Sequence, residues 1–383
     1  MDEASIEIRA ALATGANRDF EFHTLRLDQP RADEVLVRIM AVGLCHTDIS
    51  CRDSNMPSCP AVLGHEGAGI VERIGAQVTG VTVGDRVALS FRSCGQCTTC
   101  LAGDPAYCRS WVMLNFAGCR PDGSATLSDD GRPVAGSFFG QSSFATHALA
   151  YARNIVPIPD DLPFEHAAPL GCGVQTGAGA VMRSLACRQG SSLLVTGGGP
   201  VGLSAVMGGR LQGCATIILV EPHAARRTLA IEFGATHVIV PAAASDLAAA
   251  ILALRPDGVD YALDTTGLPA VQTAAMTVLA ERGTLGIVGL SPPGTPIPGE
   301  ITAVMMKGQS IRGIIEGDSD PHSFIPELIA HHRRGGKGFA GRRVDDRDRS
   351  VASDRLAADG HHIVGFVSHD LRLREGRPST GQP

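Results

Sequence analysis

The first half of the chain alternates apolar and polar residues in short runs. The clearest runs are VLVRIMAV at 35–42, GAGIVERI at 67–74 and VTVGDRVAL at 81–89. Successive side chains of a strand point to opposite faces, so a period of two indicates strands with one buried face. Glycines and polar residues separate the runs. The pattern therefore predicts a β-rich first half built from short strands.

The rhythm changes from about Gln175 onward. Helix-length segments such as TGAGAVMRSLA and PVGLSAVMGGRLQ alternate with short apolar runs such as SLLVT, TIILV and VDYAL. Continuous apolar runs between helical segments are typical of parallel strands that helices cover on both faces. The Pro- and Gly-rich stretch SPPGTPIPG at 291–299 is interpreted as a connection leaving this sheet. The second half is predicted to be a βαβ series.

The composition changes again after His332. Arg, Asp, Gly and His dominate the segment RRGGKGFAGRRVDDRDRSVASDRLAADGHH, and a short apolar patch follows at 363–367. A segment with few apolar side chains has little surface to bury. From about residue 333 we therefore expect an atypical tail that packs poorly and is disordered.

Charge and hydropathy narrow the class of protein. The 383 residues carry 33 Lys and Arg against 39 Asp and Glu, which gives a formal net charge of −6 and no basic footprint for nucleic acid. No apolar run reaches the roughly 18 residues that a membrane span needs, and the acidic start lacks the features of a leader peptide. These observations predict a cytoplasmic protein without a nucleic-acid or membrane partner.

Four cysteines crowd into the segment SCGQCTTCLAGDPAYC. They are spaced C-x2-C-x2-C-x7-C, as Cys94, Cys97, Cys100 and Cys108. This spacing lets one loop place four thiolates tetrahedrally around a single Zn²⁺, with no position left open, which is typical of a structural site. The alternatives are free or disulfide-bonded cysteines and a DNA-binding zinc ribbon. The net negative charge of the chain argues against the ribbon. Five further cysteines have no partner pattern and are interpreted as free thiols: Cys51, Cys59, Cys119, Cys187 and Cys214.

Further thiol and imidazole groups lie far apart in the sequence. Cys45 and His46 stand in GLCHTD, His65 in GHE, and Cys172 in GCGVQTG. Catalytic zinc sites are commonly assembled from several loops in this way, with three protein ligands and a fourth position for water or substrate. Single cysteines are also common as small buried hydrophobes, and single histidines as structural residues. Residue types alone leave both interpretations open.

A glycine pattern follows the apolar strand LLVT. Gly197, Gly199 and Gly202 form G-x-G-x-x-G at the start of a helical segment, and Glu221 ends the next strand, TIILVE. Such glycines let backbone N–H groups and a helix N-terminus approach a pyrophosphate, while the acidic residue accepts hydrogen bonds from the adenosine ribose. A carboxylate there repels a 2′-phosphate, so we expect NAD rather than NADP. Arg226 and the following arginine weaken that preference.

Taken together, GLCHTD, GHE with GAGIVE, the four-cysteine segment, GCGVQTG and GGGPVG resemble the zinc-dependent medium-chain alcohol dehydrogenase family. The resemblance runs from about residue 6 to about 331, and the segment 115–151 is most similar to the bacterial aryl-alcohol (benzyl-alcohol) branch. It implies an α/β protein with a GroES-like, β-rich catalytic domain and a Rossmann domain with a doubly wound parallel sheet. The expected boundaries are residues 1–173 with a structural zinc lobe at about 94–108, residues 174–312, and a return to the catalytic domain over 313–383.

The resemblance also implies roles for single residues. Cys45, His65 and Cys172 match the ligands of the catalytic zinc, Asp48 the carboxylate that orients His65, and Glu66 an acidic neighbour of the metal. Thr47 matches the hydroxyl that accepts the substrate proton, although it could also be a turn hydroxyl, as Asp48 could be a helix cap. The expected cofactor-binding residues are His46, Thr176, Gly197, Gly199, Pro200, Val201, Gly202, Glu221, Arg226 and Val288.

The sequence departs from the family at two places. Ser50 stands where many relatives carry a histidine that passes the proton to solvent, so we expect proton release through water or Ser50. After His332 the chain lacks the family's closing helix and strand.

The expected activity is reversible, NAD-dependent oxidation of primary aryl or allylic alcohols with one catalytic and one structural Zn²⁺ per subunit, in a dimer or tetramer. Rings at Trp111, Phe116, Phe138 and Phe139 could stack on an aryl substrate or simply form core. Two alternatives remain: a formaldehyde dehydrogenase that requires a thiol adduct, and an inactive relative that binds zinc and nucleotide but has lost turnover through its altered terminus.

Overall fold

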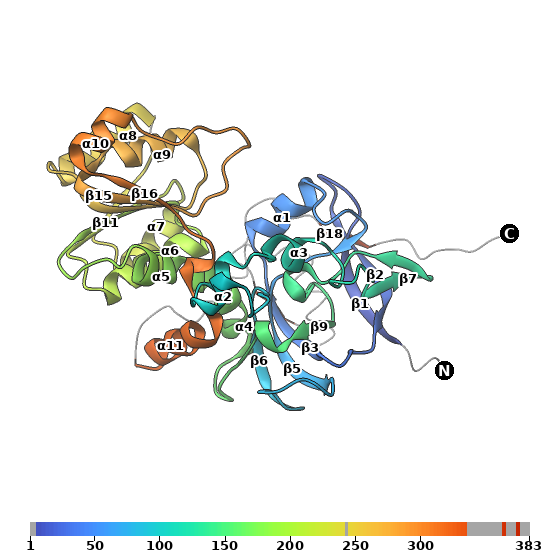
Figure 1. The fold of residues 1–383 in the computed structure, drawn as a ribbon. Helices are drawn as coiled ribbons and strands as arrows, with labels where there is room; N and C mark the ends of the chain where they lie inside the picture. The colour runs from blue at the N-terminus through green and yellow to red at the C-terminus, as the bar shows by residue number, and fades with distance from the viewer. Residues whose placement is uncertain (1–4, 242–243, 335–361, 365–372, 376–383) are drawn as a thin grey trace. The chain divides into compact units, whose positions relative to one another are not determined.

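The computed structural model describes residues 5–241, 244–334, 362–364 and 373–375 (Figure 1). These residues form two compact units. The first contains residues 5–172, 320–327 and the two short C-terminal segments, and the second contains residues 173–319 and 328–334. Within the described part of the chain, no helix has the length and apolar character to cross a membrane. Most of the tail expected from about residue 333 lies outside the described residues.

Two β-sheets form the framework of the first unit. One has the order β4-β1-β2-β7-β8, and β18 also pairs with β2. Its strands are β1 (Ser5–Ala13), β2 (Phe20–Asp28), β4 (Ala61–Val62), β7 (Leu127–Asp129), β8 (Arg132–Val134) and β18 (Leu373–Glu375). The other has the order β10-β6-β5-β3-β17, and β9 also pairs with β3. Its strands are β3 (Glu34–Gly43), β5 (Glu66–Ile74), β6 (Arg86–Leu89), β9 (His147–Tyr151), β10 (Ile155–Pro157) and β17 (His362–Val364).

The first unit also contains short helices. They are α1 (His46–Asp53), α2 (Thr98–Leu101), α3 (Trp111–Phe116) and α4 (Phe164–Ala167), with the single turns η1 (Pro105–Tyr107), η2 (Phe138–Gly140), η3 (Ala152–Asn154) and η4 (Ala168–Gly171). A longer helix, α11 (Pro321–Arg333), contributes residues to both units. The two described segments of the tail, β17 and β18, lie parallel to β3 and β2.

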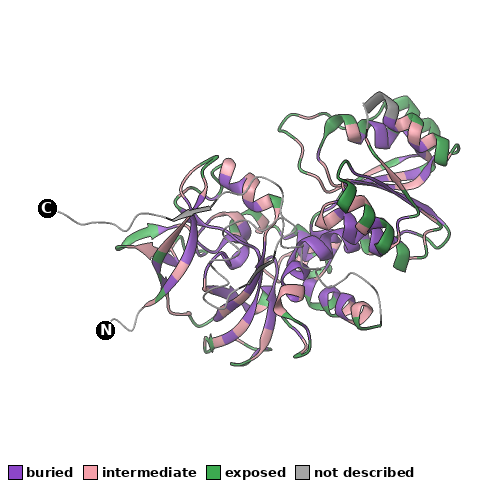
Figure 2. Ribbon diagram, turned by 180° about the vertical axis from the view of Figure 1, so that it is seen from behind, coloured by how far each residue is buried: buried purple, intermediate pink, exposed green. Residues whose placement is uncertain are grey.

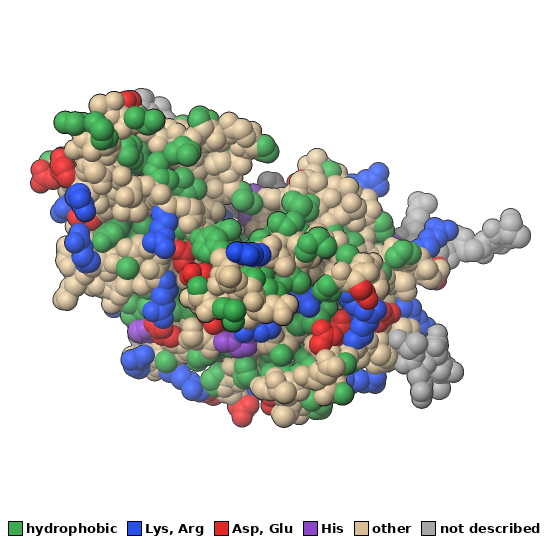
Figure 3. All heavy atoms as spheres, in the orientation of Figure 1, with side chains coloured by type: hydrophobic (Ala, Val, Ile, Leu, Met, Phe, Trp, Pro, Cys, Tyr) green, Lys and Arg blue, Asp and Glu red, His purple; other side chains and the backbone are tan. Residues whose placement is uncertain are grey.

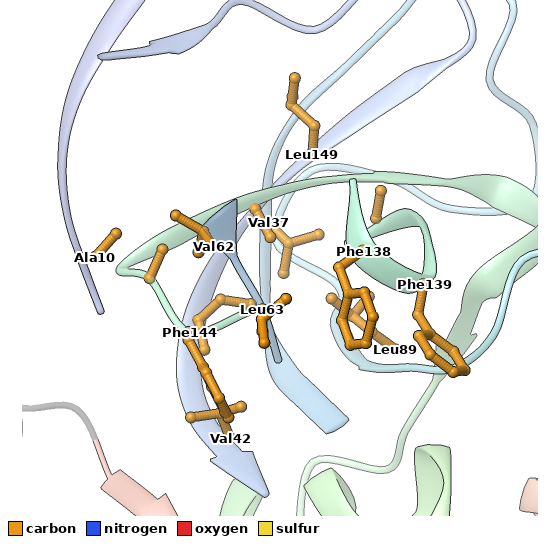
Figure 4. Packing of buried hydrophobic residues seen from close by; sticks show 14 of the residues in the cluster. Ala10, Val37, Val42, Val62, Leu63, Leu89, Phe138, Phe139, Phe144 and Leu149 are labelled. Carbon is orange, nitrogen blue, oxygen red and sulfur yellow. The ribbon is translucent and has the colours of Figure 1, made fainter. Parts of the chain in front are cut away.

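The core of the first unit lies on the buried faces of these strands (Figure 2). Val37 and Val42 of β3 belong to the same cluster as Leu63, Leu89 and Phe138, which Figure 4 shows at close range. The runs 35–42 and 67–74 therefore form the expected strands. Only the end of the run 81–89 does so, because residues 82–85 form a turn in which Asp85 accepts a hydrogen bond from the Thr82 N–H at 2.7 Å.

The second unit contains one parallel sheet of six strands in the order β13-β12-β11-β14-β15-β16. The strands are β11 (Ser192–Thr196), β12 (Thr216–Val220), β13 (His237–Ile239), β14 (Val259–Asp264), β15 (Leu279–Ile287) and β16 (Ser310–Gly313). The order reverses between β11 and β14, which is the switch point where doubly wound sheets bind their ligands. The chain leaves the sheet over 291–299 as expected, but it returns to it as β16.

Helices cover both faces of this sheet (Figure 1). One layer contains α5 (Gly173–Gly179), α6 (Pro200–Leu211) and α7 (Ala224–Phe233), and the π-helical turn η5 (Ala180–Ser184) follows α5. The other layer contains α8 (Ala244–Leu254), α9 (Pro269–Thr277) and α10 (Ile301–Lys307), and the turn η6 (Glu316–Asp318) follows β16. A GroES-like β unit and a Rossmann unit together confirm the predicted fold class.

Candidate metal centres and active site

Four thiols converge between β6 and α3. The four sulfurs lie within 4.8 Å of one another and belong to Cys94, Cys97, Cys100 and Cys108. Backbone N–H groups donate to them, from Cys97 to Cys94 Sγ at 3.3 Å and from Arg109 to Cys97 Sγ at 3.5 Å. The Thr99 hydroxyl and the Arg109 N–H lower the pKa of the Cys97 thiol to about 5. Four convergent sulfurs and donors that stabilise thiolate charge fit a closed tetrahedral zinc site.

A second group of donors comes from the end of β3, the start of β5 and the turn after η4. One atom from each member lies within 4.8 Å of the others, and the members are Cys45, His65, Glu66 and Cys172. Among the described residues, Nε2 of His65 is buried and has no hydrogen-bond partner. A buried polar atom without a partner is costly. A zinc ion that accepts this lone pair together with two thiolates would remove the cost, so the residues fit the metal.

Asp48 holds two of these donors in place. Its carboxylate is buried on the first turn of α1 and accepts hydrogen bonds from the N–H groups of Cys45 and Gly64 at 3.0 and 3.1 Å. It also lies 2.9 Å from Nδ1 of His65. Since a carboxylate only accepts, Nδ1 carries the proton and Nε2 presents its lone pair. A hydrogen bond with Cys172 outweighs burial and holds the pKa of Cys45 well below its usual range.

Gln141 and Ser90 connect the donor segments and were not predicted from the sequence. The buried Gln141 amide donates to the carbonyls of His65 and Ser90 at 2.9 and 3.1 Å, and its oxygen accepts from the Gly67 N–H at 3.1 Å. The Ser90 hydroxyl donates to the carbonyl of Gly171 at 2.7 Å. This network connects the strand that follows His65 to the turn that carries Cys172. A polar residue within GQSSFA is a weak signal, because its burial depends on the fold.

Aromatic rings pack on the imidazole of His65. Phe139 stacks on it with ring centroids 4.5 Å apart, and Phe138 meets it edge-on at 5.7 Å. Both rings are buried, whereas Trp111 and Phe116 pack against them and stay partly exposed. Figure 4 shows Phe138 and Phe139 side by side on the η2 turn. Phe139 has a left-handed backbone with φ of 52°, a strained conformation for a bulky residue that this packing maintains.

The remaining residues predicted near the metal lie on or beside α1 and β5. The hydroxyl oxygen of Thr47 is 3.6 Å from Cys45 Sγ, and the side chains of Thr47 and Ser50 are half-buried. His46 is exposed. Glu66 is buried opposite Gly43, and a Cβ at Gly43 would overlap the Glu66 carboxylate, so a larger residue there would displace the Glu66 side chain.

The glycine turn lies between β11 and α6 at the switch point of the parallel sheet. Gly197 has φ of 92°, and a Cβ at Gly202 would overlap the carbonyl of Gly197. Pro200 occupies the first turn of α6. The buried Glu221 carboxylate, just after β12, accepts hydrogen bonds at 2.7 Å from the N–H groups of Gly198 and His223. The turn thus has the close backbone and the acidic residue of a dinucleotide site.

The other predicted cofactor residues belong to the same unit. Arg226, on α7, has a guanidinium nitrogen 3.8 Å from the Glu221 carboxylate. Thr176 is buried on α5, where its hydroxyl donates to Glu316 at 3.3 Å. Val201 lies in the first turn of α6 and Val288 directly after β15, and both are half-buried. These positions surround the carboxyl end of the central strands.

Comparisons with known proteins agree with this architecture. The family model of the alcohol dehydrogenase GroES-like domain matches residues 31–160, and that of the zinc-binding dehydrogenases matches residues 200–331. A geraniol dehydrogenase from Castellaniella defragrans is 47% identical over 331 residues, which cover 86% of this chain and 89% of that protein.

Two solved structures are also similar. The benzyl alcohol dehydrogenase from Acinetobacter calcoaceticus aligns with a TM-score of 0.84 and 38% identity, over 95% of this chain and all of that one. An alcohol dehydrogenase zinc-binding domain protein from Burkholderia ambifaria aligns with a TM-score of 0.85 and 45% identity, over 93% of this chain and 95% of that one. The chain therefore belongs to the zinc-dependent medium-chain alcohol dehydrogenase family.

Proposed function

We propose that this member of the family oxidises primary aryl and allylic alcohols, of the benzyl alcohol type, reversibly with NAD⁺. The observation that carries the proposal is the group of half-buried Cys45 and buried His65 and Cys172, in which two sulfurs and an unpartnered imidazole nitrogen converge. Three ligands of this kind leave the fourth position of a tetrahedral zinc ion open for substrate. The thiols of the four-cysteine lobe would hold a second, structural zinc.

When bound, zinc would acidify the substrate hydroxyl and the nicotinamide would accept the hydride. Residues of the chain would orient the ligands and transfer the proton. The Asp48 carboxylate holds the Nδ1 proton of His65, which would leave the Nε2 lone pair free to hold a zinc ion. The Thr47 hydroxyl, 3.6 Å from Cys45 Sγ, would accept the substrate proton, and Ser50 one turn along α1, or water, would pass it on. Glu66 would serve as the acidic neighbour during ligand exchange.

The aromatic residues support an aryl or allylic substrate. Phe138 and Phe139 fix the imidazole face of His65, and the partly exposed Trp111 and Phe116 extend the same ring cluster. Apolar rings stabilise a planar, conjugated alcohol by burial and stacking, and they offer nothing to the charged part of a thiol adduct. The names of the similar geraniol and benzyl alcohol dehydrogenases point to the same class of substrate.

We propose NAD as the cofactor, held by Gly197, Gly199 and Gly202 with Glu221 at the ribose. The buried Glu221 carboxylate would repel a 2′-phosphate. Pro200, Val201, Thr176, Val288, His46 and Arg226 would complete the cofactor contacts. None of the eleven cysteines forms a disulfide, which suits a reducing compartment and supports a cytoplasmic location.

We also propose that the chain forms a homodimer or homotetramer. Exposed apolar side chains gather near α10 in the second unit, at the upper left of Figure 3, and include Ile297, Ile301, Met305 and Met306. Several large apolar side chains exposed close together are typical of an interface. Sedimentation should show a dimer or tetramer, and Met305→Glu should shift it toward smaller species; a wild-type monomer at micromolar concentration would contradict this part of the proposal.

The substrate proposal is tested by kcat/KM of the zinc-loaded protein for benzyl alcohol, geraniol and ethanol, and for formaldehyde with and without glutathione. We expect the first two alcohols to exceed ethanol by at least about tenfold, the value of one good aromatic or apolar contact. A rate that appears only with formaldehyde and glutathione would favour the thiol-adduct enzyme. Cofactor binding without turnover of any substrate would favour the inactive relative. Replacing NAD⁺ by NADP⁺ in the same assay tests the cofactor.

A further inference from the structure

Two cysteines outside both metal-binding groups meet in the second unit. Cys187 follows η5, and Cys214 follows α6. Their segments run side by side, because the Gly190 N–H donates to the carbonyl of Gly213 at 2.8 Å. The side chain of Cys187 is buried and that of Cys214 is half-buried.

The two side chains are in hydrogen-bonding contact. The Cys187 thiol donates a hydrogen bond to the Cys214 sulfur, both cysteines are free thiols, and the Ser191 hydroxyl lies 3.6 Å from Cys214 Sγ. The backbone fixes both cysteines, since the N–H of Cys187 donates to Val181 and that of Cys214 to Gly209, each at 3.0 Å. The contact therefore belongs to the folded backbone and does not depend on a flexible loop.

The pair is chemically asymmetric. Hydrogen bonds from Cys187 and Ser191 outweigh burial and lower the pKa of Cys214 to about 7. The same bond to Cys214, together with burial, raises the pKa of Cys187, and the carboxylate of Asp260 opposes ionisation of both thiols. Cys214 thus carries thiolate character at a partly exposed position, while Cys187 stays a buried thiol in contact with it. A reactive thiol beside a resolving thiol is the arrangement of a redox-responsive pair.

We propose that Cys187 and Cys214 form a peroxide-reactive site that closes to a reversible intramolecular disulfide. The Cys214 thiolate attacks hydrogen peroxide and becomes a sulfenic acid, while the departing oxygen takes a proton and leaves as water. The Cys187 thiol then attacks the Cys214 sulfur, so that an S–S bond forms, the S–O bond breaks, and a second water leaves. Two thiols and one peroxide give one disulfide and two waters, and a small dithiol reverses the reaction.

The position of the bond gives it a structural consequence. The closed loop, residues 187–214, contains β11, the glycine turn and α6. Oxidation would therefore tie together the two ends of the strand–turn–helix unit in which the cofactor is proposed to bind. The thiol chemistry itself depends on neither zinc nor the proposed alcohol oxidation.

The experiment treats the full-length, zinc-loaded protein with hydrogen peroxide, blocks free thiols with an alkylating agent and maps tryptic peptides by mass spectrometry. Cleavage places Cys187 in the peptide 184–188, Cys214 in the peptide 211–226, and the half-buried Cys119 in the peptide 110–153, because Arg120 and Arg132 precede prolines; each peptide has a single cysteine. We expect a linked peptide 184–188 plus 211–226 that dithiothreitol removes. Before oxidation, Cys214 should be alkylated about tenfold faster than Cys119 at neutral pH.

Two variants separate the roles of the thiols. Cys187→Ser should abolish the linked peptide and leave a sulfenic acid at Cys214 that dimedone captures. Cys214→Ser should abolish both products. The proposal is overturned if the wild-type protein shows stable sulfenic acid at Cys214 without the linked peptide, or if Cys214 and Cys119 are oxidised and alkylated at equal rates. Because the mapping of the wild-type protein needs no variant, poor folding of either mutant leaves the test intact.

Discussion

The two groups of candidate metal ligands in this chain are built in opposite ways. The four thiols of the lobe come from one segment, residues 94–108, and the local backbone supplies N–H donors to their sulfurs. The other group takes its donors from three separate places, around residues 45, 65 and 172. Asp48, Gln141 and Ser90 connect these places through buried hydrogen bonds.

This difference between a local and a dispersed arrangement indicates which kind of metal site each one suits. A local lobe can close around a metal with little help from the remaining fold, so its metal should stabilise structure. A site assembled across the fold depends on packing to set its geometry, and it can leave one position open for chemistry. Changes in the dispersed group should therefore affect turnover first, and changes in the lobe should affect stability first.

The largest effect on activity is expected from Cys172→Ser. Removing a thiolate from the dispersed group should weaken metal binding and cost several kcal/mol of transition-state stabilisation, that is, a loss of at least about a hundredfold in kcat/KM for benzyl alcohol. Steady-state rates, with NADH binding measured in parallel, check this. The control is Cys119→Ser, outside both groups, which should keep wild-type activity. Equal rates for Cys172→Ser and wild type would disprove the assignment.

Cys100→Ser tests the expectation that the four-cysteine lobe stabilises the fold. Losing one of four thiolates should release the structural zinc and lower the thermal midpoint by several degrees, because a structural metal contributes directly to folding. The zinc content measured by elemental analysis should fall from two ions per chain to one, because the dispersed site keeps its ion. An unchanged midpoint together with an unchanged zinc content would show that the lobe does not bind metal.

Gln141→Leu tests whether the buried network positions the dispersed donors. It removes two donated hydrogen bonds and one accepted bond, so the segments of His65 and Cys172 should hold metal about ten- to a hundredfold more weakly. Competition with a chelator measures this affinity, and the absorption spectrum of the Co²⁺-loaded variant reports altered ligand geometry. The exposed Gln77→Leu is the matched control. If the spectrum and the metal affinity are both unaltered, Gln141 does not position the metal donors.

The smallest effect is expected from Ser50→Ala. Water can replace the half-buried hydroxyl of Ser50 in proton release, so alcohol oxidation should slow only a few-fold. The pH dependence of kcat measured beside wild type checks this expectation. A loss of more than about a hundredfold would make Ser50 an essential part of the proton path.

The same contrast explains how much could be read from the sequence. The spacing of Cys94, Cys97, Cys100 and Cys108 is local, so residues alone indicate that lobe. The G-x-G-x-x-G pattern likewise predicts the turn between β11 and α6. By contrast, Cys45, His65 and Cys172 are ordinary residues until a family pattern relates them, since their spacing says nothing about contacts between segments far apart in the chain.

Other features depend on tertiary packing and have no sequence signature. Gln141 lies in an unremarkable polar run, and its three hydrogen bonds exist because β5, β6 and the η2 turn meet around it. The contact between Cys187 and Cys214 has the same origin, because the segments that lead into β11 and β12 run side by side and bring together two thiols that appeared unrelated. The described strand β18 likewise has no signature in the polar composition of the tail, whereas β17 overlaps the apolar patch at 363–367.

The central claim is that the dispersed group makes this chain an alcohol dehydrogenase. The most direct test is NADH formation by zinc-loaded wild-type protein given benzyl alcohol and NAD⁺ at mildly alkaline pH, where loss of the alcohol proton is favoured. The account predicts sustained turnover that a chelator abolishes and added zinc restores. Protein that contains two zinc ions per chain, binds NADH and yet turns over neither benzyl alcohol nor geraniol would contradict it.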